Sequence, residues 1–409
     1  MRVGIVGGGI VGSAAAAWLL ADGVDVTVFE RDPEGRPAST GNAGLLNLPE
    51  ISPLARPAIL ASVPGWLLDP LGPLTLRARD LPSLTPFLAR FVWSARPAQV
   101  ERATEALAFI MKTALIDHQE LARRANLPMY MRRNGAIYLY DTEAAYRSAQ
   151  AEWQDRGRHG AEYEEMSIED AKAMVPALGG GFERVVFTPD QWSVTSPLEV
   201  LLGLRDAVRA RGKFLTGTVT DIRPEGDGVA VVTKDGAAKF DRVLLSGGVW
   251  SRDLVRKLGL RVLLEAERGY NTTYPDPGFS ITVPVFLSSH GFVVSPLNDG
   301  LRVGGAVELA AVDAPPNFAR AAAMRKKARR YFPDLPEEGG REWMGARPAT
   351  PDSMAVIGPY PKDPRVVFAF GHGHLGLTLS AATARHVAGL LTTGRREKNL
   401  EPFGIERFQ

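Results

Sequence analysis

The glycines near the N-terminus are the feature that most restricts how this chain can fold. Gly7, Gly9 and Gly12 lie within an uncharged stretch of 19 residues, 3–21. A stretch of that length is long enough to cross a membrane, and its small residues weakly imitate a signal peptide. However, three consecutive glycines at 7–9 would destabilise a helix by about 1 kcal/mol each relative to alanine. The pattern instead predicts a strand, a tight turn and a helix, in that order.

The elements around these glycines predict a dinucleotide-binding βαβ unit. We expect strands at 3–6 and 25–29 and a helix at 13–21 between them. In such a unit the three glycines permit the turn, the approach of a pyrophosphate and close packing of helix on strand, and the phosphates lie on the helix N-terminus. Glu30, 18 residues beyond Gly12, is placed to accept hydrogen bonds from an adenosine ribose. The predicted contacts are Gly7, Gly9, Ile10, Val11, Gly12, Glu30 and Arg31.

A small, polar, glycine-rich loop follows this unit at 39–45. Its backbone could lie flat against an isoalloxazine ring, which favours a flavin over a nicotinamide cofactor. An ordinary turn-rich loop would have the same composition, and that interpretation stays open here. The residues predicted to contact the cofactor are Ser39, Thr40, Asn42, Ala43, Gly44 and Leu45.

Composition excludes several other classes of protein. The 409 residues include no cysteine, so disulfides, Cys-ligated zinc, iron–sulfur clusters, thiol nucleophiles and cofactors tethered through cysteine are excluded. A cytoplasmic enzyme is therefore expected. Lys and Arg number 48 against 46 Asp and Glu, and the basic helix expected at 321–331 has no interleaved aromatic residues, so we predict no nucleic-acid partner. Neither a nucleophile-elbow nor a P-loop spacing is present.

The middle of the chain predicts helices and then antiparallel strands. Helices are expected at 103–125 and 197–210, the second with Ser196 as N-cap and Pro197 at its first position. Strands are then expected at 214–222, 229–233, 243–246, 282–286, 291–295 and 301–308. The strand at 243–246 runs into a second glycine turn, where Gly247 and Trp250 are predicted to approach the cofactor.

A second strand–glycine turn–helix pattern lies near the C-terminus. We expect a strand at 366–370 and a helix at 377–391, whose N-terminal amides would face a developing negative charge. His372 and His374 have no third ligand nearby in sequence, so no metal is predicted. A role for His374 beside the cofactor and simple loop packing are equally compatible with the sequence. The predicted contacts are Gly371, Gly373, His374, Leu375, Gly376, Leu377 and Thr378.

Motifs spread over almost the whole chain resemble the D-amino-acid oxidase superfamily of flavoproteins, which includes glycine and sarcosine oxidases. The most similar branch is that of the bacterial D-amino-acid dehydrogenases. The segments that carry the resemblance occur in family order: Gly7-Gly-Gly-Ile-Val-Gly12 with Glu30, Thr40-Gly-Asn-Ala-Gly44, Asp69-Pro-Leu-Gly-Pro-Leu74, Arg302-Val-Gly-Gly-Ala-Val-Glu308, Arg347-Pro-Ala-Thr-Pro-Asp352 and Gly371-His-Gly-His-Leu-Gly-Leu-Thr378.

The resemblance implies an α/β fold with two domains and a non-covalently bound FAD. Its Rossmann-type FAD-binding domain would be assembled from the discontinuous segments 1–58, 160–258 and 340–409. A substrate-binding domain with a mainly antiparallel sheet would comprise 59–159 and 259–339.

The resemblance also assigns roles to residues of the predicted site. Arg347 matches the arginine that binds the substrate carboxylate, although an arginine in a proline-rich loop would otherwise be interpreted as part of a structural salt bridge. Tyr270 matches a substrate-side tyrosine less securely. Val219 begins the strand whose backbone contacts adenine. Together with His374, Arg347 and Tyr270 form the predicted catalytic set.

The predicted activity is oxidation of a D-amino acid or a cyclic imino acid, such as a D-proline derivative, to the imine. Hydride would pass to flavin N5, and electrons would then pass to a quinone or another acceptor. Two alternatives remain open: an oxygen-using amine oxidase of the glycine or sarcosine type, and a non-catalytic flavin-binding subunit. The apolar segment 59–96, with interspersed Arg, would be a peripheral patch on the inner face of the cytoplasmic membrane or, as we favour, packing around the active-site entrance.

Overall fold

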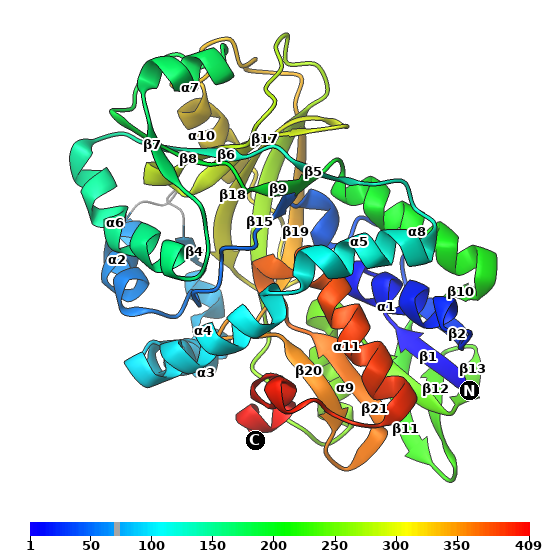
Figure 1. The fold of residues 1–409 in the computed structure, drawn as a ribbon. Helices are drawn as coiled ribbons and strands as arrows, with labels where there is room; N and C mark the ends of the chain where they lie inside the picture. Colours follow the sequence, from blue (N-terminus) through cyan, green and yellow to red (C-terminus); the bar gives the residue numbers. More distant parts are fainter. Residues whose placement is uncertain (69–73) are drawn as a thin grey trace.

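The computed structural model describes residues 1–68 and 74–409. Residues 69–73 of the Asp69-Pro-Leu-Gly-Pro-Leu74 motif lie outside the described residues. Two large sheets dominate the architecture, and helices α1 (Ile10–Ala21), α5 (Ala114–Ala125) and α11 (Ser380–Thr393) pack together beside the six-stranded sheet (Figure 1). Strands from the first, middle and last thirds of the chain meet in the six-stranded sheet, where residues 242–245 pair with a strand from each end of the chain.

The six-stranded sheet contains the predicted βαβ unit. In order across the sheet its strands are β10 (Lys213–Thr216), β2 (Asp25–Glu30), β1 (Arg2–Val6), β14 (Arg242–Leu245), β21 (Asp363–Phe370) and β20 (Val356–Tyr360). The first five strands are parallel, and β20 is antiparallel to β21. The apolar start of the chain is therefore a buried strand followed by a helix, as predicted.

Helices cover one face of this sheet. They are α1 (Ile10–Ala21), α5 (Ala114–Ala125), α8 (Pro197–Arg211) and α11 (Ser380–Thr393), with α4 (Pro97–Met111) beside them. Helix α1 is apolar on all sides, and its alanines at 14–17 are buried, which is typical of a helix enclosed by neighbours. Because alanine side chains are short, α5, α8 and α11 can all pack against it.

A smaller antiparallel sheet covers the opposite face. It consists of β11 (Val219–Glu225), β12 (Gly228–Thr233) and β13 (Gly236–Phe240), and helix α9 (Ser251–Lys257) packs against β11. Alternate residues of β14 and β21 point to this side, and Val243, Val366 and Phe368 share one apolar cluster with Val229 and Val231. The period of two along each strand thus gives the six-stranded sheet two buried faces.

The second large sheet has nine strands and is mainly antiparallel. Its order is β19 (Arg341–Ala349), β15 (Glu265–Tyr274), β18 (Gly300–Leu309), β17 (Phe292–Leu297), β16 (Val285–Leu287), β6 (Ala136–Tyr140), β8 (Arg184–Thr188) and β7 (Glu164–Met166), with β4 (Leu74–Leu76) also pairing with β18. Helix α10 (Ala319–Ala328) packs on β15 and β18.

The remaining elements connect these layers. They are the three-stranded sheet β3 (Leu45–Leu46), β9 (Trp192–Val194) and β5 (Met131–Arg133), and the helices α2 (Pro57–Leu68), α3 (Leu81–Ser94), α6 (Glu143–Arg158) and α7 (Ile168–Met174). Short 3₁₀ helices are η1 (Ala38–Gly41), η2 (Ala78–Asp80), η3 (Gly248–Trp250), η4 (Ser288–His290), η5 (Gly373–Leu375), η6 (Lys398–Phe403) and η7 (Ile405–Phe408).

The capping residues in the sequence predicted the start of one helix correctly. Ser196 caps α8 through its hydroxyl, which accepts a hydrogen bond from the Glu199 amide at 3.3 Å, and Pro197 occupies the first helical position, as predicted. The helix predicted over 103–125 is instead two helices, because α4 ends at Met111 and α5 begins at Ala114.

Strand pairing also differs from the prediction in three places. The strand expected at 214–222 is two strands, β10 and β11, which belong to different sheets. The segment that begins at Gly345, expected to be a proline-stiffened loop, starts within strand β19. Strands β7, β8 and β19 pair within the nine-stranded sheet, although the predicted boundaries grouped 164–188 and 341–349 with the FAD-binding domain. Antiparallel partners far away in sequence decide this membership, so local periodicity did not reveal it.

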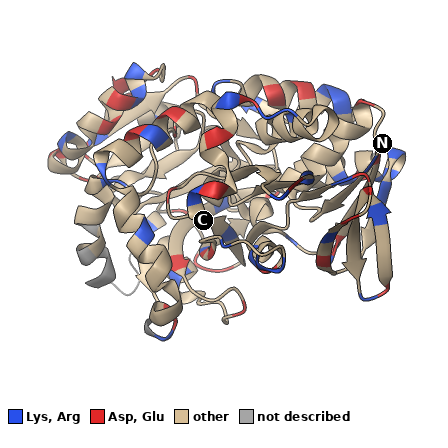
Figure 2. Ribbon diagram, turned by 90° about the horizontal axis from the view of Figure 1, so that it is seen from below, with Lys and Arg blue, Asp and Glu red and all other residues tan. Residues whose placement is uncertain are grey.

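Charged residues of both signs are interspersed along the elements seen from below in Figure 2. Within residues 1–68 and 74–409, no helix combines the length and the apolarity that crossing a bilayer requires.

Candidate active site

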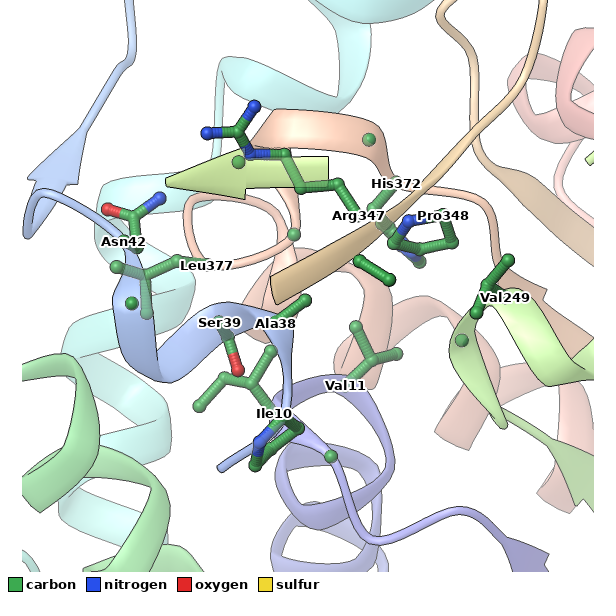
Figure 3. Close-up of a pocket in the computed structure, with 18 of the residues that line it drawn as sticks. Ile10, Val11, Ala38, Ser39, Asn42, Val249, Arg347, Pro348, His372 and Leu377 are labelled. Carbon is green, nitrogen blue, oxygen red and sulfur yellow. The ribbon is translucent and has the colours of Figure 1, made fainter. Parts of the chain in front are cut away.

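A cavity of about 650 Å³ lies between the two large sheets. Its size falls in the range of about 300–1,000 Å³ that small-molecule sites occupy. The wall on the six-stranded sheet comes from the βαβ unit, and the opposite wall comes from β19, β15, β18 and β17. In the close-up, Ile10 and Val11 lie on one side, Arg347 on the other, and Ala38 and Ser39 between them (Figure 3).

The glycine turn after β1 shapes the first end of the cavity. Gly7 has a φ of +104°, and a Cβ there would lie 2.6 Å from the Ser246 carbonyl oxygen. A Cβ on Gly12 would lie 1.9 Å from the Gly7 oxygen, so this glycine allows the helix to approach the strand. Gly9 caps α1 without a side-chain hydrogen bond, and a Cβ there would meet no protein atom within 4 Å. The N-terminus of α1 is therefore open to the cavity.

Glu30 lies beside this turn. Its two oxygens accept hydrogen bonds from the amides of Gly8, at 2.7 Å, and Asp32, at 3.0 Å. Arg205 of α8 is 1% exposed and donates to the carbonyls of Gly8, at 3.0 Å, and Pro33, at 2.6 Å. Sequence reasoning missed Arg205. It lies within a predicted amphipathic helix, and only the packing of α8 on α1 brings it to the glycine turn.

Val219, Gly247 and Trp250, which are predicted to contact the cofactor, line the end of the cavity where the nucleotide is expected. The guanidinium of Arg31 lies 3.5 Å from the centre of the Trp250 ring, within the distance of a cation–π contact. Burial lowers the pKa of Arg31. These side chains can enclose a planar heterocycle at this end.

The loop at 38–47 forms the middle of the cavity. Ser39, Asn42, Ala43 and Leu45 line it, as predicted, together with Ala38, Gly41 and Asn47. Thr40 and Gly44 do not line it. The buried Thr40 hydroxyl donates to the Pro37 carbonyl at 2.9 Å, and Gly44 supplies a φ of +80° in the loop. Both residues therefore determine the shape of the loop but do not line the cavity.

The second glycine loop, 371–378, contributes the neighbouring wall. Its lining residues are His372, Gly373, His374, Gly376, Leu377 and Thr378, whereas the predicted contacts Gly371 and Leu375 do not line the cavity. The helix expected from 377 begins only at Ser380, so η5 and the following turn, and not the N-terminus of α11, face the cavity. Buried His372 hydrogen-bonds to the Thr383 hydroxyl at 3.0 Å, and desolvation lowers its pKa to about 4.

A histidine that sequence reasoning missed supports this loop from behind. The Nε2 of buried His118 lies 3.1 Å from the Leu377 carbonyl and 3.0 Å from the Thr378 carbonyl. Its Nδ1 lies 2.9 Å from the Tyr130 hydroxyl. Because carbonyls only accept, Nε2 carries the proton in the neutral ring. Desolvation lowers the pKa of His118 to about 4, which keeps the ring neutral at physiological pH.

Arg347 lies on β19 at the far end of the cavity. Its Nη1 donates to Glu267 Oε1 at 2.8 Å, across the β15–β19 pair. The salt bridge of the alternative interpretation is thus present, and Arg347 also lines the cavity. A Cβ on Gly269 would lie 2.3 Å from Arg347 Nη2 and 3.0 Å from Nε, so this edge of the guanidinium lies directly over the glycine. Among the described residues, no hydrogen-bond partner is recorded for that edge.

Tyr270 follows Gly269 on β15, and its side chain points into the core of the nine-stranded sheet. The ring is 1% exposed and packs in the core beneath α10. Its hydroxyl donates to Glu308 Oε2 at 2.5 Å and accepts from the Asn317 amide at 3.0 Å. Both hydrogen-bonding roles of the hydroxyl are therefore occupied, although Tyr270 is among the residues that line the cavity.

The residues present fit the dinucleotide that the sequence predicts. The uncapped amides of α1, the open face of Gly9 and the carboxylate of Glu30 suit a pyrophosphate and a ribose, and the cavity continues from there to Arg347. Because Gly9 has no side chain, a pyrophosphate can approach the backbone at this turn. In the described part of the chain, no three His, Cys, Asp or Glu side chains are grouped so that they could hold a metal ion.

These features define a class: a dinucleotide-dependent oxidoreductase in which a Rossmann-type sheet and a mainly antiparallel sheet share one cavity. The family described as "DAO: FAD dependent oxidoreductase" matches residues 2–390, and the chain belongs to it. The predicted family, fold class, FAD cofactor and enzyme class are thereby confirmed.

Relatives agree with this assignment. A D-amino-acid oxidase of Bradyrhizobium diazoefficiens is 33% identical over 416 residues, which cover 100% of this chain and 99% of that protein. A D-amino acid dehydrogenase of Paramagnetospirillum magneticum is 30% identical over 422 residues, covering 100% and 99%. Among solved structures, L-proline dehydrogenase from P. horikoshii superposes with a TM-score of 0.74 at 18% identity, covering 100% of this chain and 97% of that one. Glycine oxidase from Geobacillus kaustophilus gives 0.72 at 22%, covering 99% and 98%.

Proposed function

We propose that this protein oxidises a D-amino acid or a cyclic imino acid, such as a D-proline derivative, to the imine. The observation that carries the proposal is the guanidinium edge of Arg347, which faces the same cavity as the dinucleotide-binding turn. The names of the relatives, D-amino-acid oxidase and D-amino acid dehydrogenase, support the same substrate class.

Arg347 is the proposed carboxylate-binding group. Because Nη1 is held by Glu267 at 2.8 Å, Nε and Nη2 remain for the substrate. Two parallel N–H groups on one edge match the two oxygens of a carboxylate. This side-on arrangement fixes the position of the α-carbon, since the carboxylate is bonded to it.

The strands beside Arg347 suggest where the substrate side chain lies. From β19 the sheet continues through Gly269 of β15 and Gly305 of β18 to Phe292 of β17, all of which line the cavity. Phe286 of β16 lines it as well. Glycines in the two central strands leave room, and the Phe286 ring beyond them offers an apolar surface. The Phe292 ring, 5% exposed, packs in the same core cluster as Tyr270. We therefore propose a neutral, apolar side chain for the preferred substrate.

FAD, held at the N-terminus of α1 and beside Glu30, would supply the acceptor for the hydride that leaves the α-carbon as the amine becomes the imine. The chain's own residues orient the substrate through Arg347, with Trp343 and Phe286 lining the same cavity, and such alignment supplies much of the rate enhancement. The described carboxylates in the cavity lining, Glu30, Asp32 and Asp253, belong to the nucleotide end. The amine is therefore proposed to react in its neutral form. His374 stays the candidate group beside the cofactor, and Tyr270 becomes a positioning residue.

The electron acceptor is proposed to be a quinone or another acceptor, with oxygen as the second candidate. The two candidates correspond to the two names among the relatives, dehydrogenase and oxidase. For a membrane quinone, contact with the inner face of the cytoplasmic membrane through 59–96 would deliver electrons. The packing of Leu84 and Phe87 of α3 against Leu309 and Ala349 favours the other interpretation, an apolar wall beside β18 and β19.

The deciding experiment is anaerobic titration of the yellow protein with a panel of D- and L-amino acids, followed by air. Bleaching by neutral D-amino acids or D-proline supports the proposal, and bleaching by none of the panel would favour a non-catalytic flavin-binding subunit. Stoichiometric hydrogen peroxide at turnover would identify oxygen as the acceptor.

Arg347→Ala tests the carboxylate site in the same assay. We expect FAD to stay bound and kcat/KM to fall about 100-fold or more, because two charge-assisted hydrogen bonds of about 1.5–3 kcal/mol each are lost. Arg341→Ala, at the exposed start of the same strand, is the matched control and should behave as wild type. Loss of flavin with normal turnover of the fraction that retains it would contradict the role of Arg347.

A further inference from the structure

Two buried polar side chains of the nine-stranded sheet reach the backbone of the loop at 38–47, called the cofactor loop below. Arg302 of β18 and Asn271 of β15 are 5% and 2% exposed. The two strands are neighbours, and Asn271 lies opposite Gly304, two residues from Arg302. Both side chains extend to residues 40–42, which precede them by more than 220 positions in the chain. Neither belongs to the predicted site.

Together they bind three consecutive carbonyls. Arg302 Nη1 donates to the oxygens of Asn42, at 2.7 Å, and Thr40, at 3.1 Å. Asn271 Nδ2 donates to the oxygen of Gly41 at 2.9 Å. The other two guanidinium nitrogens each have a partner as well: Nε donates to the Thr273 hydroxyl and Nη2 to Asp299, both at 2.9 Å.

We propose that Arg302, with Asn271, is a positioning residue that orients the peptides of residues 40–43 toward the cofactor. In a trans peptide the carbonyl and the following N–H point in opposite directions. When Arg302 takes the Asn42 carbonyl, the N–H of Ala43 is turned away from Arg302. Ala43 lines the cavity, whereas Arg302 lies on the other side of the loop, so this N–H faces the cofactor space.

The surroundings leave the loop few alternatives. Among the described residues, no hydrogen bond is recorded for the Ala43 amide, so it is available to a ligand. On the β19 side, a Cβ on Gly41 would lie 1.9 Å from the Trp343 ring, which shows how closely the loop sits on the sheet. Removing the guanidinium would leave two buried carbonyls and Asp299 without their partner, which costs about 1–3 kcal/mol for each unsatisfied group. Arg302 therefore links the substrate sheet to the cofactor loop.

The proposal depends on the FAD cofactor of the family and not on the substrate proposed above. It is tested by reconstituting apoprotein with FAD. Arg302→Lys retains the positive charge but lacks the forked guanidinium that binds several acceptors at once. Asn271→Ser removes only the contact to Gly41. Asp299→Asn and Thr273→Val are the matched controls, because each keeps Arg302 on the loop while changing its other side. The measurements are the Kd for FAD, the visible absorption and circular dichroism of bound flavin, and the thermal midpoint of the apoprotein.

We expect Arg302→Lys and Asn271→Ser to weaken FAD binding at least about tenfold, the loss of one good hydrogen bond, and to alter the visible bands. Arg302→Met should have a larger effect if it folds, and the two milder variants decide the outcome if it does not. The controls should stay within a few-fold of wild type. Wild-type Kd and visible bands in both Arg302→Lys and Asn271→Ser, with only the apoprotein midpoint lowered, would show a merely structural role and overturn the proposal.

Discussion

The edge that Arg347 offers to the cavity is determined by its neighbours and not by its residue type alone. Glu267 occupies Nη1, and Nε and Nη2 lie over Gly269, where a Cβ would be 3.0 and 2.3 Å away from them. An arginine at this position in a sequence indicates a charge. The direction of that charge depends on Glu267, which lies opposite Arg347 on β15, and on Gly269, two residues further along the same strand.

Gly269→Ala tests this arrangement. The new methyl group would lie 2.3 Å from Nη2 and 2.5 Å from Cζ of Arg347, so the guanidinium must turn away from the substrate position. We expect KM for the amino-acid substrate to rise about tenfold or more, with the Kd for FAD unchanged, in steady-state kinetics and FAD titration. Gly180→Ala, where a Cβ meets nothing within 4 Å, serves as control. An unchanged KM would mean that Arg347 does not bind the carboxylate through this edge.

Tyr270 shows how residue-level resemblance can identify the right strand and the wrong side chain. Strand β15 pairs with β19 continuously from Glu265 to Thr273, and the register shift opposite Arg268 and Tyr270 comes from one extra residue in β18. The regular alternation of β15 places the Tyr270 ring in the core and leaves Gly269 at the cavity, beneath Arg347. Nothing local in the sequence marks which face of β15 is turned to the cavity, since this depends on how the strand packs in the folded protein.

At the scale of elements, the βαβ unit separates two kinds of glycine. Gly12 is required for packing, because a Cβ there would collide with the Gly7 carbonyl at 1.9 Å. Gly9 has no such neighbour in the protein. The backbone conformation of Gly9 is one that any residue can adopt. The protein itself therefore does not require a glycine here, whereas a ligand bound at this position would.

Gly9→Ala should separate folding from cofactor binding. We expect the thermal midpoint of the apoprotein to stay within about 2 °C of wild type, because the methyl group meets no protein atom and the change costs under about 0.5 kcal/mol. FAD binding should weaken at least about tenfold, as the methyl group enters the space at the N-terminus of α1. Calorimetry of apoprotein and FAD titration measure the two effects. Wild-type affinity for FAD in this variant would place the pyrophosphate elsewhere.

The two glycine loops form one wall because other elements join them. Thr378 Oγ1 accepts a hydrogen bond from the Asn47 amide at 3.1 Å, which connects loop 371–378 to the loop after β2. His118 of α5 binds the carbonyls of Leu377 and Thr378 from behind. The sequence indicated both loops, but their contact and the later start of α11 follow from these partners.

At the scale of the whole molecule, buried neutral histidines couple stability to pH. Desolvation lowers the pKa of His118 and of His372 to about 4, against about 6.5 for an exposed imidazole. Between these two values the unfolded chain binds more protons than the folded protein. The free energy of unfolding must therefore rise with pH across this window and fall as the pH is lowered through it.

We expect each of these histidines to contribute a slope of up to about 1.4 kcal/mol per pH unit between roughly pH 6.5 and 4. Urea denaturation of the FAD-loaded protein at several pH values measures the slope. His118→Gln should reduce the slope by the contribution of one titrating group. His159→Gln, a change at an exposed side chain, should leave the slope unchanged. An identical slope in His118→Gln and wild type would show that His118 is already protonated in the folded protein.

The sequence by itself determined the βαβ unit, the helix caps, the absence of a cysteine-linked flavin and the family, because each depends on residues close together or on motifs kept in order. Tertiary structure alone decided the sheet to which β19 belongs, the direction of Tyr270, and the positions of Arg205, His118 and Arg302. Each of these depends on a partner far away in the chain: Arg302 and Asn42 are 260 residues apart. Local periodicity carries no information about such pairs, since their contact exists only once both sheets have packed around the cavity.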